Sequence, residues 1–384
     1  MNNILEERSI NPMQKTLHKP LKCLFAALAL YLTVFLVIEP ERCLGAAKDA
    51  FSLCQSTIIP SFLPFFVCSG LLSALGFSHL CSVFLSPVMR PLFHLPGSSA
   101  LAFFLGLVSG YPMGAVVAAD LYERGECTKA EAERMTAFCN NSGPIFVLGV
   151  VGGGYLKSEA LGWYLYIAHI LAALIVGVLF RLYRGKGERK NILPPHSVGK
   201  KDNMAGSLGS IIDSSVFSVL KICGFVIFFA VVASAIPRGS YLSYIYPIVE
   251  ITGGLNLLCG TDMDFSAKLS LVSFFLAFSG ISVVFQVSSI IAPKGLSILP
   301  YLLGKLLQGG LAAVIVRTLL WIFPMDEGAF LPDFVPYHPQ VSPLGTFFVS
   351  IILMLLCMLL LAIFMLIADF FEKRGSSSGR QKVS

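Results

Sequence analysis

Charged residues are scarce in this sequence of 384 residues, because Asp, Glu, Lys and Arg together make up only 13%. A soluble domain carries roughly 25%, since its surface needs polar side chains that water can solvate. The deficit therefore argues against a soluble enzyme. The net charge of +6 gathers at segment ends, which is how membrane topology is encoded, so the sequence predicts no nucleic-acid partner.

Motifs for several kinds of chemistry are also missing. The ten cysteines include no C-x-x-C pair, so neither a zinc site nor a redox dithiol is expected. No P-loop and no H-E-x-x-H motif occurs, which argues against ATP-driven transport by this chain alone and against zinc hydrolysis. We therefore predict a protein that is not an enzyme and that carries no metal or cofactor.

The sequence is dominated by long apolar runs. A bilayer-spanning helix needs about 20 apolar residues, and runs of that order recur along the chain, five before and five after a polar linker. They are 21–38, 56–76, 98–119, 136–153, 160–182, 208–236, 241–260, 268–292, 296–323 and 344–368. The sequence thus predicts an all-α, polytopic membrane protein in contact with lipid. The first run has no cleavage site after it and is expected to stay as a helix.

Lys and Arg clusters predict the topology. They lie in the N-terminal segment 1–20, in the linker 183–206 and in the tail 369–384, and such clusters mark the cytoplasmic side. If all three are cytoplasmic, each half needs an even number of crossings, whereas each has five apolar runs. One run in each half is therefore expected to enter and leave the membrane on the same side.

The two halves, 45–182 and 207–323, also resemble each other. Phe103–Gly110 can be laid on Phe274–Gly280, and Leu171–Val176 on Leu311–Val316, in the same order. The flanking helices place the start of the two halves on opposite sides. We therefore predict inverted repeats with broken or re-entrant helices, a plan that holds a transported solute near the membrane midplane.

Two polar breaks in the first half are candidate binding elements. Ser109 and Tyr111 lie in a Gly- and Pro-containing interruption of run 98–119, where freed backbone groups need partners. Asn140, Asn141 and Ser142 precede Gly-Pro at the start of the next apolar stretch, where a half-helix beginning at Pro144 would attract anions. The alternatives are a kink satisfied by neighbouring helices and an ordinary helix cap.

The second half offers matching candidates. Ser279, Ser282 and Gln286 lie inside run 268–292, where polar residues also serve simply to join helices. Glu250 and Thr252 lie in run 241–260, and an ionisable residue inside a membrane segment is a functional candidate. Because that run is short, a position of Glu250 at the membrane surface is the alternative.

Other polar residues are given structural interpretations. Lys221, Lys305 and Arg317 are expected to extend toward the membrane surface, although Lys221 is also a substrate candidate. His169 and Gln308 are interpreted as helix-packing residues. Thr128 and Glu131 fit a capping box, which predicts a short helix whose charges, within 120–134, face water.

Several of these motifs together resemble a family, the YlbJ (SpoVV) sporulation integral membrane proteins. This family lies within a wider group that shares the nucleoside recognition or Gate domain. The resemblance covers roughly residues 20–370. Its specific part consists of Ile59–Phe66, Ser86–Phe93, Ser109–Ala115, Thr128–Arg134 and Asn140–Pro144. The second half is similar through Glu250–Gly253, Ser279–Ser282 and Gln286-Val287. Gln308 stands where the family commonly has His, and Phe285 where it often has a small residue.

The resemblance implies a fold related to concentrative nucleoside transporters and a role in endospore formation. It implies a carrier for a small organic anion, dipicolinic acid, in the outer forespore membrane of the mother cell, needed for the spore cortex. A nucleoside carrier and a non-transporting scaffold of a sporulation complex are alternatives. A coupling ion, either a proton or sodium, and a homo-oligomer are left open.

Overall fold

The computed structural model describes residues 12–75, 77–183, 204–237 and 244–325. Within these ranges the chain forms helices and connecting turns and no strand. The predicted last helix, 344–368, the tail and most of the linker lie outside the described residues. The all-α prediction is confirmed, and the chain is a polytopic membrane protein: four described helices are long and apolar enough to cross a membrane.

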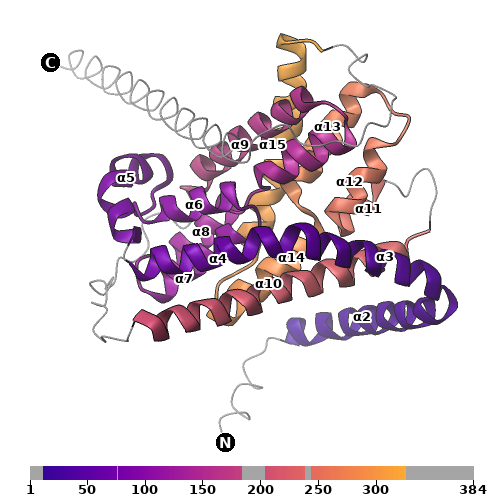
Figure 1. The fold of residues 1–384 in the computed structure, drawn as a ribbon, viewed down its shortest axis with the longest axis horizontal. Coiled ribbons are helices and arrows are strands. Elements are labelled where there is room, and N and C mark those ends of the chain that lie inside the picture. Colours follow the sequence, from indigo (N-terminus) through magenta and orange to yellow (C-terminus); the bar gives the residue numbers. More distant parts are fainter. Residues whose placement is uncertain (1–11, 76, 184–203, 238–243, 326–384) are drawn as a thin grey trace, which may run out of the picture.

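Long helices form one edge of the molecule. Figure 1 shows α3 and α4 as an almost continuous rod that runs beside α10, with α2 folded back at one end. This continuity exists because a short π-helical turn, η1, joins α3 to α4 without a break. The bounds are α2 (Pro12–Ile38), α3 (Pro40–Leu53), η1 (Cys54–Ile58), α4 (Ile59–Ala74) and α10 (Met204–Ser234).

The rest of the first half is a bundle of shorter helices. After α5, the chain forms the hairpin α6/α7, then the interrupted pair α8 and η2, then the long helix α9. Thr128 and Glu131 cap α8 reciprocally, as predicted. The bounds are α5 (Phe77–Phe93), α6 (Ser99–Val108), α7 (Met113–Glu123), α8 (Lys129–Cys139), η2 (Ile145–Tyr155) and α9 (Glu159–Phe180).

The second half follows the same order of elements after α10. A hairpin α11/α12 is followed by the interrupted pair α13 and α14, the short η4, and the long helix α15. The break between α13 and α14 is sharp, because Ser279 and Gly280 both have positive φ, 69° and 77°. The bounds are α11 (Tyr246–Val249), α12 (Ile251–Cys259), α13 (Phe265–Phe278), α14 (Gly280–Ile291), η4 (Ala292–Lys294) and α15 (Leu299–Ile322).

The two interrupted pairs run in opposite directions. The start of α8 lies at the end of α9, where Arg134 donates to the carbonyl of Arg181. The end of α14 reaches the same end of the bundle, because Lys294 pairs with Glu123 at 2.7 Å. Hence α8–η2 leads away from this end, and α13–α14 leads toward it. Opposite directions are what an inverted duplication predicts, and the duplication itself stays a prediction.

The contacts between elements repeat in the two halves. The second helix of each hairpin packs against both interrupted pairs: α7 contacts α8 and α14, and α12 contacts α13 and η2. This order pairs the break at 140–144 with the break at Ser279. The sequence match had instead paired the break at 109–114 with Ser279. The order of helices therefore shifts the predicted alignment by one helical element.

Glycine allows the first hairpin to approach the interrupted pair. A Cβ atom at Gly106 or Gly114 would collide with the carbonyl oxygen of Cys139, the last residue of α8. Since backbone packs on backbone here, neither position has room for any side chain. This contact fixes the turn between α6 and α7 directly beside the break after α8.

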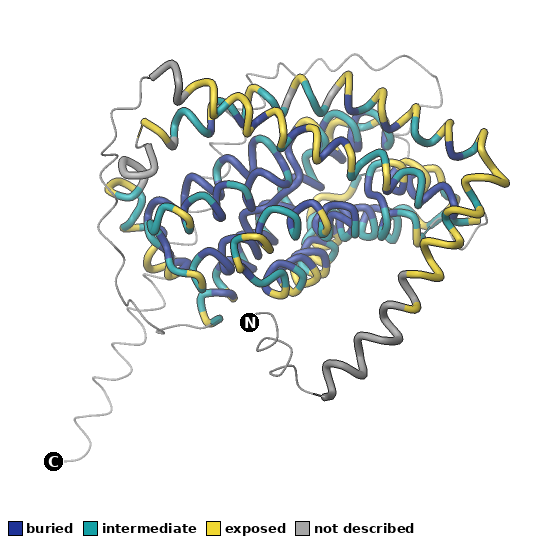
Figure 2. Tube along the Cα trace, turned by 90° about the horizontal axis from the view of Figure 1, so that it is seen from below, coloured by how far each residue is buried: buried dark blue, intermediate teal, exposed yellow. Residues whose placement is uncertain are grey.

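Burial follows the expected pattern for a protein in lipid. Figure 2 shows buried residues in the middle of the bundle and exposed residues on the outer faces of the long helices. The outer face of α10 exposes Phe217, Leu220 and Phe228, which suits contact with lipid tails. In the 18-residue apolar window of α10 only 28% of residues are buried, against 61% in α9.

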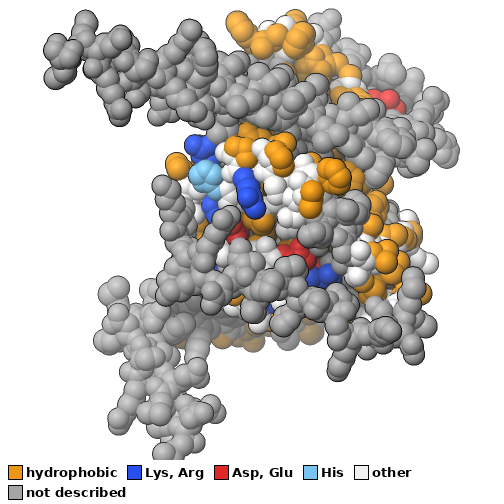
Figure 3. Space-filling view, turned by 90° about the vertical axis from the view of Figure 1, so that its left-hand side faces the viewer, with side chains coloured by type: hydrophobic (Ala, Val, Ile, Leu, Met, Phe, Trp, Pro, Cys, Tyr) orange, Lys and Arg blue, Asp and Glu red, His pale blue; other side chains and the backbone are white. Residues whose placement is uncertain are grey.

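Charged side chains gather at one end of the bundle. They come from the end of α7, the start of α8 and η4, and they include the pairs Arg124–Asp120 and Lys294–Glu123. Figure 3, which views the molecule from the left of Figure 1, shows acidic and basic side chains among hydrophobic ones. The prediction that the charges of 120–134 face water is wrong for Glu133 and Arg134, which are both buried. The Glu133 carboxylate accepts from the Ser297 amide at 2.9 Å.

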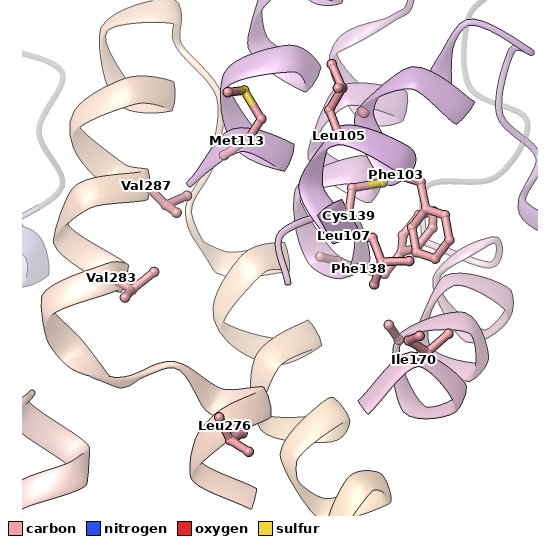
Figure 4. Close-up of a cluster of buried hydrophobic side chains, with 14 of the residues drawn as sticks. Phe103, Leu105, Leu107, Met113, Phe138, Cys139, Ile170, Leu276, Val283 and Val287 are labelled. Carbon is pink, nitrogen blue, oxygen red and sulfur yellow. The ribbon is translucent and has the colours of Figure 1, made fainter. Parts of the chain in front are cut away.

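The apolar core unites both halves. Figure 4 shows side chains of the first half, among them Met113, Phe138 and Ile170, in one cluster with Leu276 and Val287 of the second half. A shared core of this kind makes the two halves one packed unit. The breaks in the helices lie at its centre.

Candidate functional site

A cavity of about 130 Å³ lies where the tips of the two hairpins meet. Its wall comes from both halves: the end of α3, η1, α4, α10, the start of η2, and α14. The hairpin tips contribute Ser109–Tyr111 and Glu250–Thr252. Six of the ten residues predicted from the sequence line this cavity: Ser109, Tyr111, Glu250, Thr252, Ser282 and Gln286.

Three helix starts converge on the cavity. The first residue of η2, Ile145, the first residues of α12, Ile251 and Thr252, and the first turn of α14, with Ser282, all line it. Each start directs the positive end of a helix dipole toward the cavity. The predicted half-helix start at Pro144 is confirmed with a shift of one residue, since Pro144 is the cap and Ile145 begins the helix.

Glu250 is the charged residue of the described cavity lining. Its side chain caps α12: Oε1 accepts from the Thr252 amide at 2.9 Å and Oε2 from the Gly253 amide at 2.7 Å. Only 7% of Glu250 is exposed, so protein encloses its carboxylate. The cap fixes the carboxylate at the cavity wall and uses part of the positive potential of α12.

Other polar groups of the cavity have few protein partners. The Ser109 hydroxyl is buried and lacks a hydrogen-bond partner among the described residues. The Gln286 side chain, 3% exposed, donates to Ser282 Oγ at 3.4 Å, which is a long hydrogen bond. Because buried polar groups are nearly always hydrogen-bonded, these groups indicate a place for a polar molecule.

The four remaining predicted residues, Asn140, Asn141, Ser142 and Ser279, do not line the cavity but lie buried behind its wall. Asn141 Nδ2 donates to the Phe138 carbonyl at 2.8 Å. Ser142 Oγ donates to the Leu276 carbonyl at 2.9 Å. The breaks of the two interrupted pairs therefore hold each other.

These residues belong to a buried polar cluster, which we define as Asn141, Ser142, His169, Lys305 and Gln308. Lys305 Nζ donates to Gln308 Oε1 at 2.7 Å, and Gln308 Nε2 donates to Asn141 Oδ1 at 2.9 Å. The Ser142 amide donates to His169 Nε2 at 3.2 Å. The cluster connects α8, the break after it, α9 and α15.

Sequence reasoning missed the importance of three members of this cluster. Lys305 has 0% exposure, so the prediction that it extends to the membrane surface is wrong. Arg317, in contrast, is exposed. The available signal was the spacing of Lys305 and Gln308, because residues three apart share one helix face and polar residues on one face of a membrane helix usually face protein.

The cluster and the cavity touch. Tyr111 belongs to the cavity wall, and its hydroxyl interacts with the Ser142 side chain behind that wall. At the break between α13 and α14, Ser279 Oγ lies 3.0 Å from the Tyr301 hydroxyl of α15. In the part of the chain that the structure describes, no three His, Cys, Asp or Glu side chains come together as metal ligands.

Comparison with known proteins gives a matching family model and a relative. The nucleoside recognition family model matches residues 56–158, which include the first hairpin and the break at 140–144. The sporulation integral membrane protein YlbJ of Bacillus subtilis (strain 168) is 34% identical over 336 residues, which is 78% of this chain and 82% of that protein. No solved structure matches the chain.

Proposed function

Because the chain belongs to the family of the sporulation integral membrane protein YlbJ, we propose that it is a carrier for a small organic anion, with dipicolinic acid as the solute. The carrier acts during spore formation, in the outer forespore membrane of the mother cell, and supports cortex formation and spore maturation. It binds its solute without changing it chemically. The family resemblance supplies the solute and the membrane, and the cavity supports a binding role.

The observation that carries the proposal is the meeting of two hairpins that approach from opposite ends of the bundle. The hairpin α6/α7 starts from the charged end, and α11/α12 starts from the other end, yet both tips line one cavity. Such an arrangement lets either hairpin open a path to its own side of the membrane. Carriers built from inverted repeats work in this way around a central site.

The lining suits a flat, acidic solute. Phe62, Phe65 and Phe146 offer apolar surface for an aromatic ring. The three helix starts at the cavity supply positive potential, which favours carboxylates. Dipicolinate is a planar dianion at neutral pH. Ser109 and Gln286 supply further hydrogen-bonding groups, and Gln286 is able to donate and accept.

A second candidate, a nucleoside carrier, is favoured by one specific observation. Glu250 and Gln286 line the same cavity, and no Lys or Arg occurs among its described lining residues. A carboxylate and an amide suit the hydroxyl groups of a ribose. Ribose hydroxyls donate to a carboxylate, and they both donate to and accept from a side-chain amide. The name of the matching family model, nucleoside recognition, points in the same direction.

Uptake by proteoliposomes of the purified protein tests the proposal. Labelled dipicolinate and labelled uridine are offered in parallel, and Glu250→Gln is compared with Ser273→Ala. Ser273 is a matched control because its hydroxyl is buried without a partner among the described residues and does not line the cavity. We expect saturable dipicolinate uptake that changes at least tenfold in Glu250→Gln and stays unchanged in Ser273→Ala.

The other outcomes separate the alternatives. Uptake of uridine without uptake of dipicolinate would identify the protein as a nucleoside carrier. If neither solute is taken up by folded protein, variants are tested for sporulation in cells. Normal sporulation with substitutions at Asn141, Glu250 and Gln286 would support the non-transporting scaffold and contradict a carrier.

A further inference from the structure

Lys305 is a buried lysine without an anionic partner. Its side chain lies in the second turn of α15 with 0% exposure, and its Nζ donates to the neutral amide oxygen of Gln308 at 2.7 Å. No Asp or Glu forms an ion pair with it in the described residues. Moving an unpaired ammonium out of water costs several kcal/mol, so a lysine in this place needs a reason.

The dipoles of two helices favour a positive charge at the position of Lys305. The donor chain from Lys305 through Gln308 and Asn141 ends on the carbonyl of Phe138, in the last turn of α8. The Ser142 hydroxyl reaches the carbonyl of Leu276, in the last turn of α13. The negative ends of two half-helices thus meet at the cluster. Such helix ends bind coupling cations in carriers with broken helices.

The neighbours of Lys305 do not supply a counter-charge. From α9, His169 accepts the Ser142 amide proton at Nε2, so its own ring proton is assigned to Nδ1 and the ring is neutral. From α8 comes the Cys139 thiol, and α13 has Lys268, in its first turn, as its one charged residue. On α15 itself Tyr301 lies one turn away.

The cluster lies directly behind the cavity wall. Lys305 donates to Gln308, and Gln308 donates to Asn141. The next residue, Ser142, interacts with the hydroxyl of Tyr111, a residue that lines the cavity. Inside protein two charges interact several times more strongly than in water. A negative charge that enters the cavity therefore stabilises an ammonium at Lys305.

We propose that Lys305 binds a proton when an anion occupies the cavity and releases it when the anion leaves, so that proton and anion cross together. This inference rests on the proposed function, because it needs an anionic solute. The proton comes from water on the side of entry, forms an N–H bond at Nζ, and returns to water on the side of release. Coupling is reciprocal: the anion favours the protonated lysine, and the protonated lysine favours the anion.

Proton uptake on binding tests this inference. Calorimetric titrations with dipicolinate, in buffers of different ionisation enthalpy at one pH, give the number of protons taken up for each anion bound. We expect uptake above zero and up to about one proton in the unmodified protein. In Lys305→Gln we expect loss of this uptake and affinity that is weaker by about tenfold or more.

Lys221→Gln is the matched control. Lys221 also lies in a membrane helix, and its Nζ donates to the Ser289 carbonyl at 3.1 Å, but it is exposed and outside the cluster. We expect normal proton uptake in this variant. Thermal unfolding of each variant shows that it is folded. Binding without proton uptake in the unmodified protein, or unchanged uptake in Lys305→Gln, overturns the inference.

Absence of dipicolinate binding to folded protein has a different meaning. It shows that dipicolinate is not the solute. The protonation of Lys305 is then measured directly. Nitrogen-15 NMR of labelled lysine, with the Lys305 signal identified by its loss in Lys305→Gln, follows the charge between about pH 5 and pH 10. A lysine that stays charged throughout overturns the inference. A lysine that titrates supports it for another anion.

Discussion

The cavity and the buried polar cluster both contain serine and amide side chains, but these side chains differ in how far their hydrogen bonds are satisfied. In the cluster, Asn141 and Gln308 bond to each other, and each also bonds to a further protein group. In the cavity, Ser109 has no partner among the described residues and Gln286 has one long hydrogen bond. The paired amides of the cluster join helices, whereas the polar groups of the cavity have hydrogen-bonding capacity that the described residues do not use.

The difference has a physical cause. Within a membrane, an unsatisfied polar group costs several kcal/mol because water is absent. The cluster avoids most of this cost, since its amides are paired within the protein and His169 Nδ1 is its one atom without a partner among the described residues. The cavity bears part of this cost, which a bound solute of the kind we propose would relieve. Substitutions in the two regions should therefore affect different properties.

The largest expected effect is on stability, from Gln308→Leu. This change removes the acceptor of Lys305 and the donor to Asn141 and leaves two buried polar groups without these partners. Each buried polar group left unsatisfied costs about 1–3 kcal/mol. We expect a strongly lowered midpoint of thermal unfolding in detergent, measured by intrinsic fluorescence.

Gln308→Glu sharpens this prediction. It keeps the acceptor for Lys305 and adds the missing negative charge, so the protein should keep most of its stability. It should also hold Lys305 protonated and reduce proton uptake on anion binding. Equal midpoints for Gln308→Leu and the unmodified protein would contradict the structural role that we assign to the cluster.

The next effect is on binding, from Gln286→Leu. A hydrogen bond to a charged group contributes about 1.5–3 kcal/mol, so we expect solute affinity to fall by about tenfold or more while the unfolding midpoint stays nearly unchanged. Asn256→Leu is the control, because Asn256 is an exposed amide of α12 outside the cavity lining. Loss of stability without loss of affinity would show that Gln286 belongs with the cluster.

The smallest effect is expected from Ser109→Ala. Ser109 and Ser99 both have buried hydroxyls without a partner among the described residues, but only Ser109 lines the cavity. A neutral hydrogen bond contributes about 0.5–1.5 kcal/mol, so Ser109→Ala should weaken binding by about two- to tenfold. Ser99→Ala should leave binding unchanged. Equal binding by both variants would remove Ser109 from the site.

The sequence predicted the positions of the helix breaks better than the hydrogen-bond partners of the side chains at these breaks. Ser109, Glu250 and Gln286 were found because polar residues, Gly and Pro interrupt apolar runs at these places, and such interruptions have few explanations in lipid. Asn141 was found for the same reason, but its side chain lies in the cluster. Residue type does not say which way a side chain points, because that depends on which helix lies opposite.

The sequence alone determined that this chain is an all-α membrane protein with broken helices and that it resembles a sporulation family, because apolar run length, charge position and motif order are local properties of the chain. The tertiary structure decided that the two hairpin tips share one cavity and that Lys305 is buried behind it. These facts depend on contacts between residues more than 100 positions apart, such as Gln308 and Asn141, which no local pattern specifies.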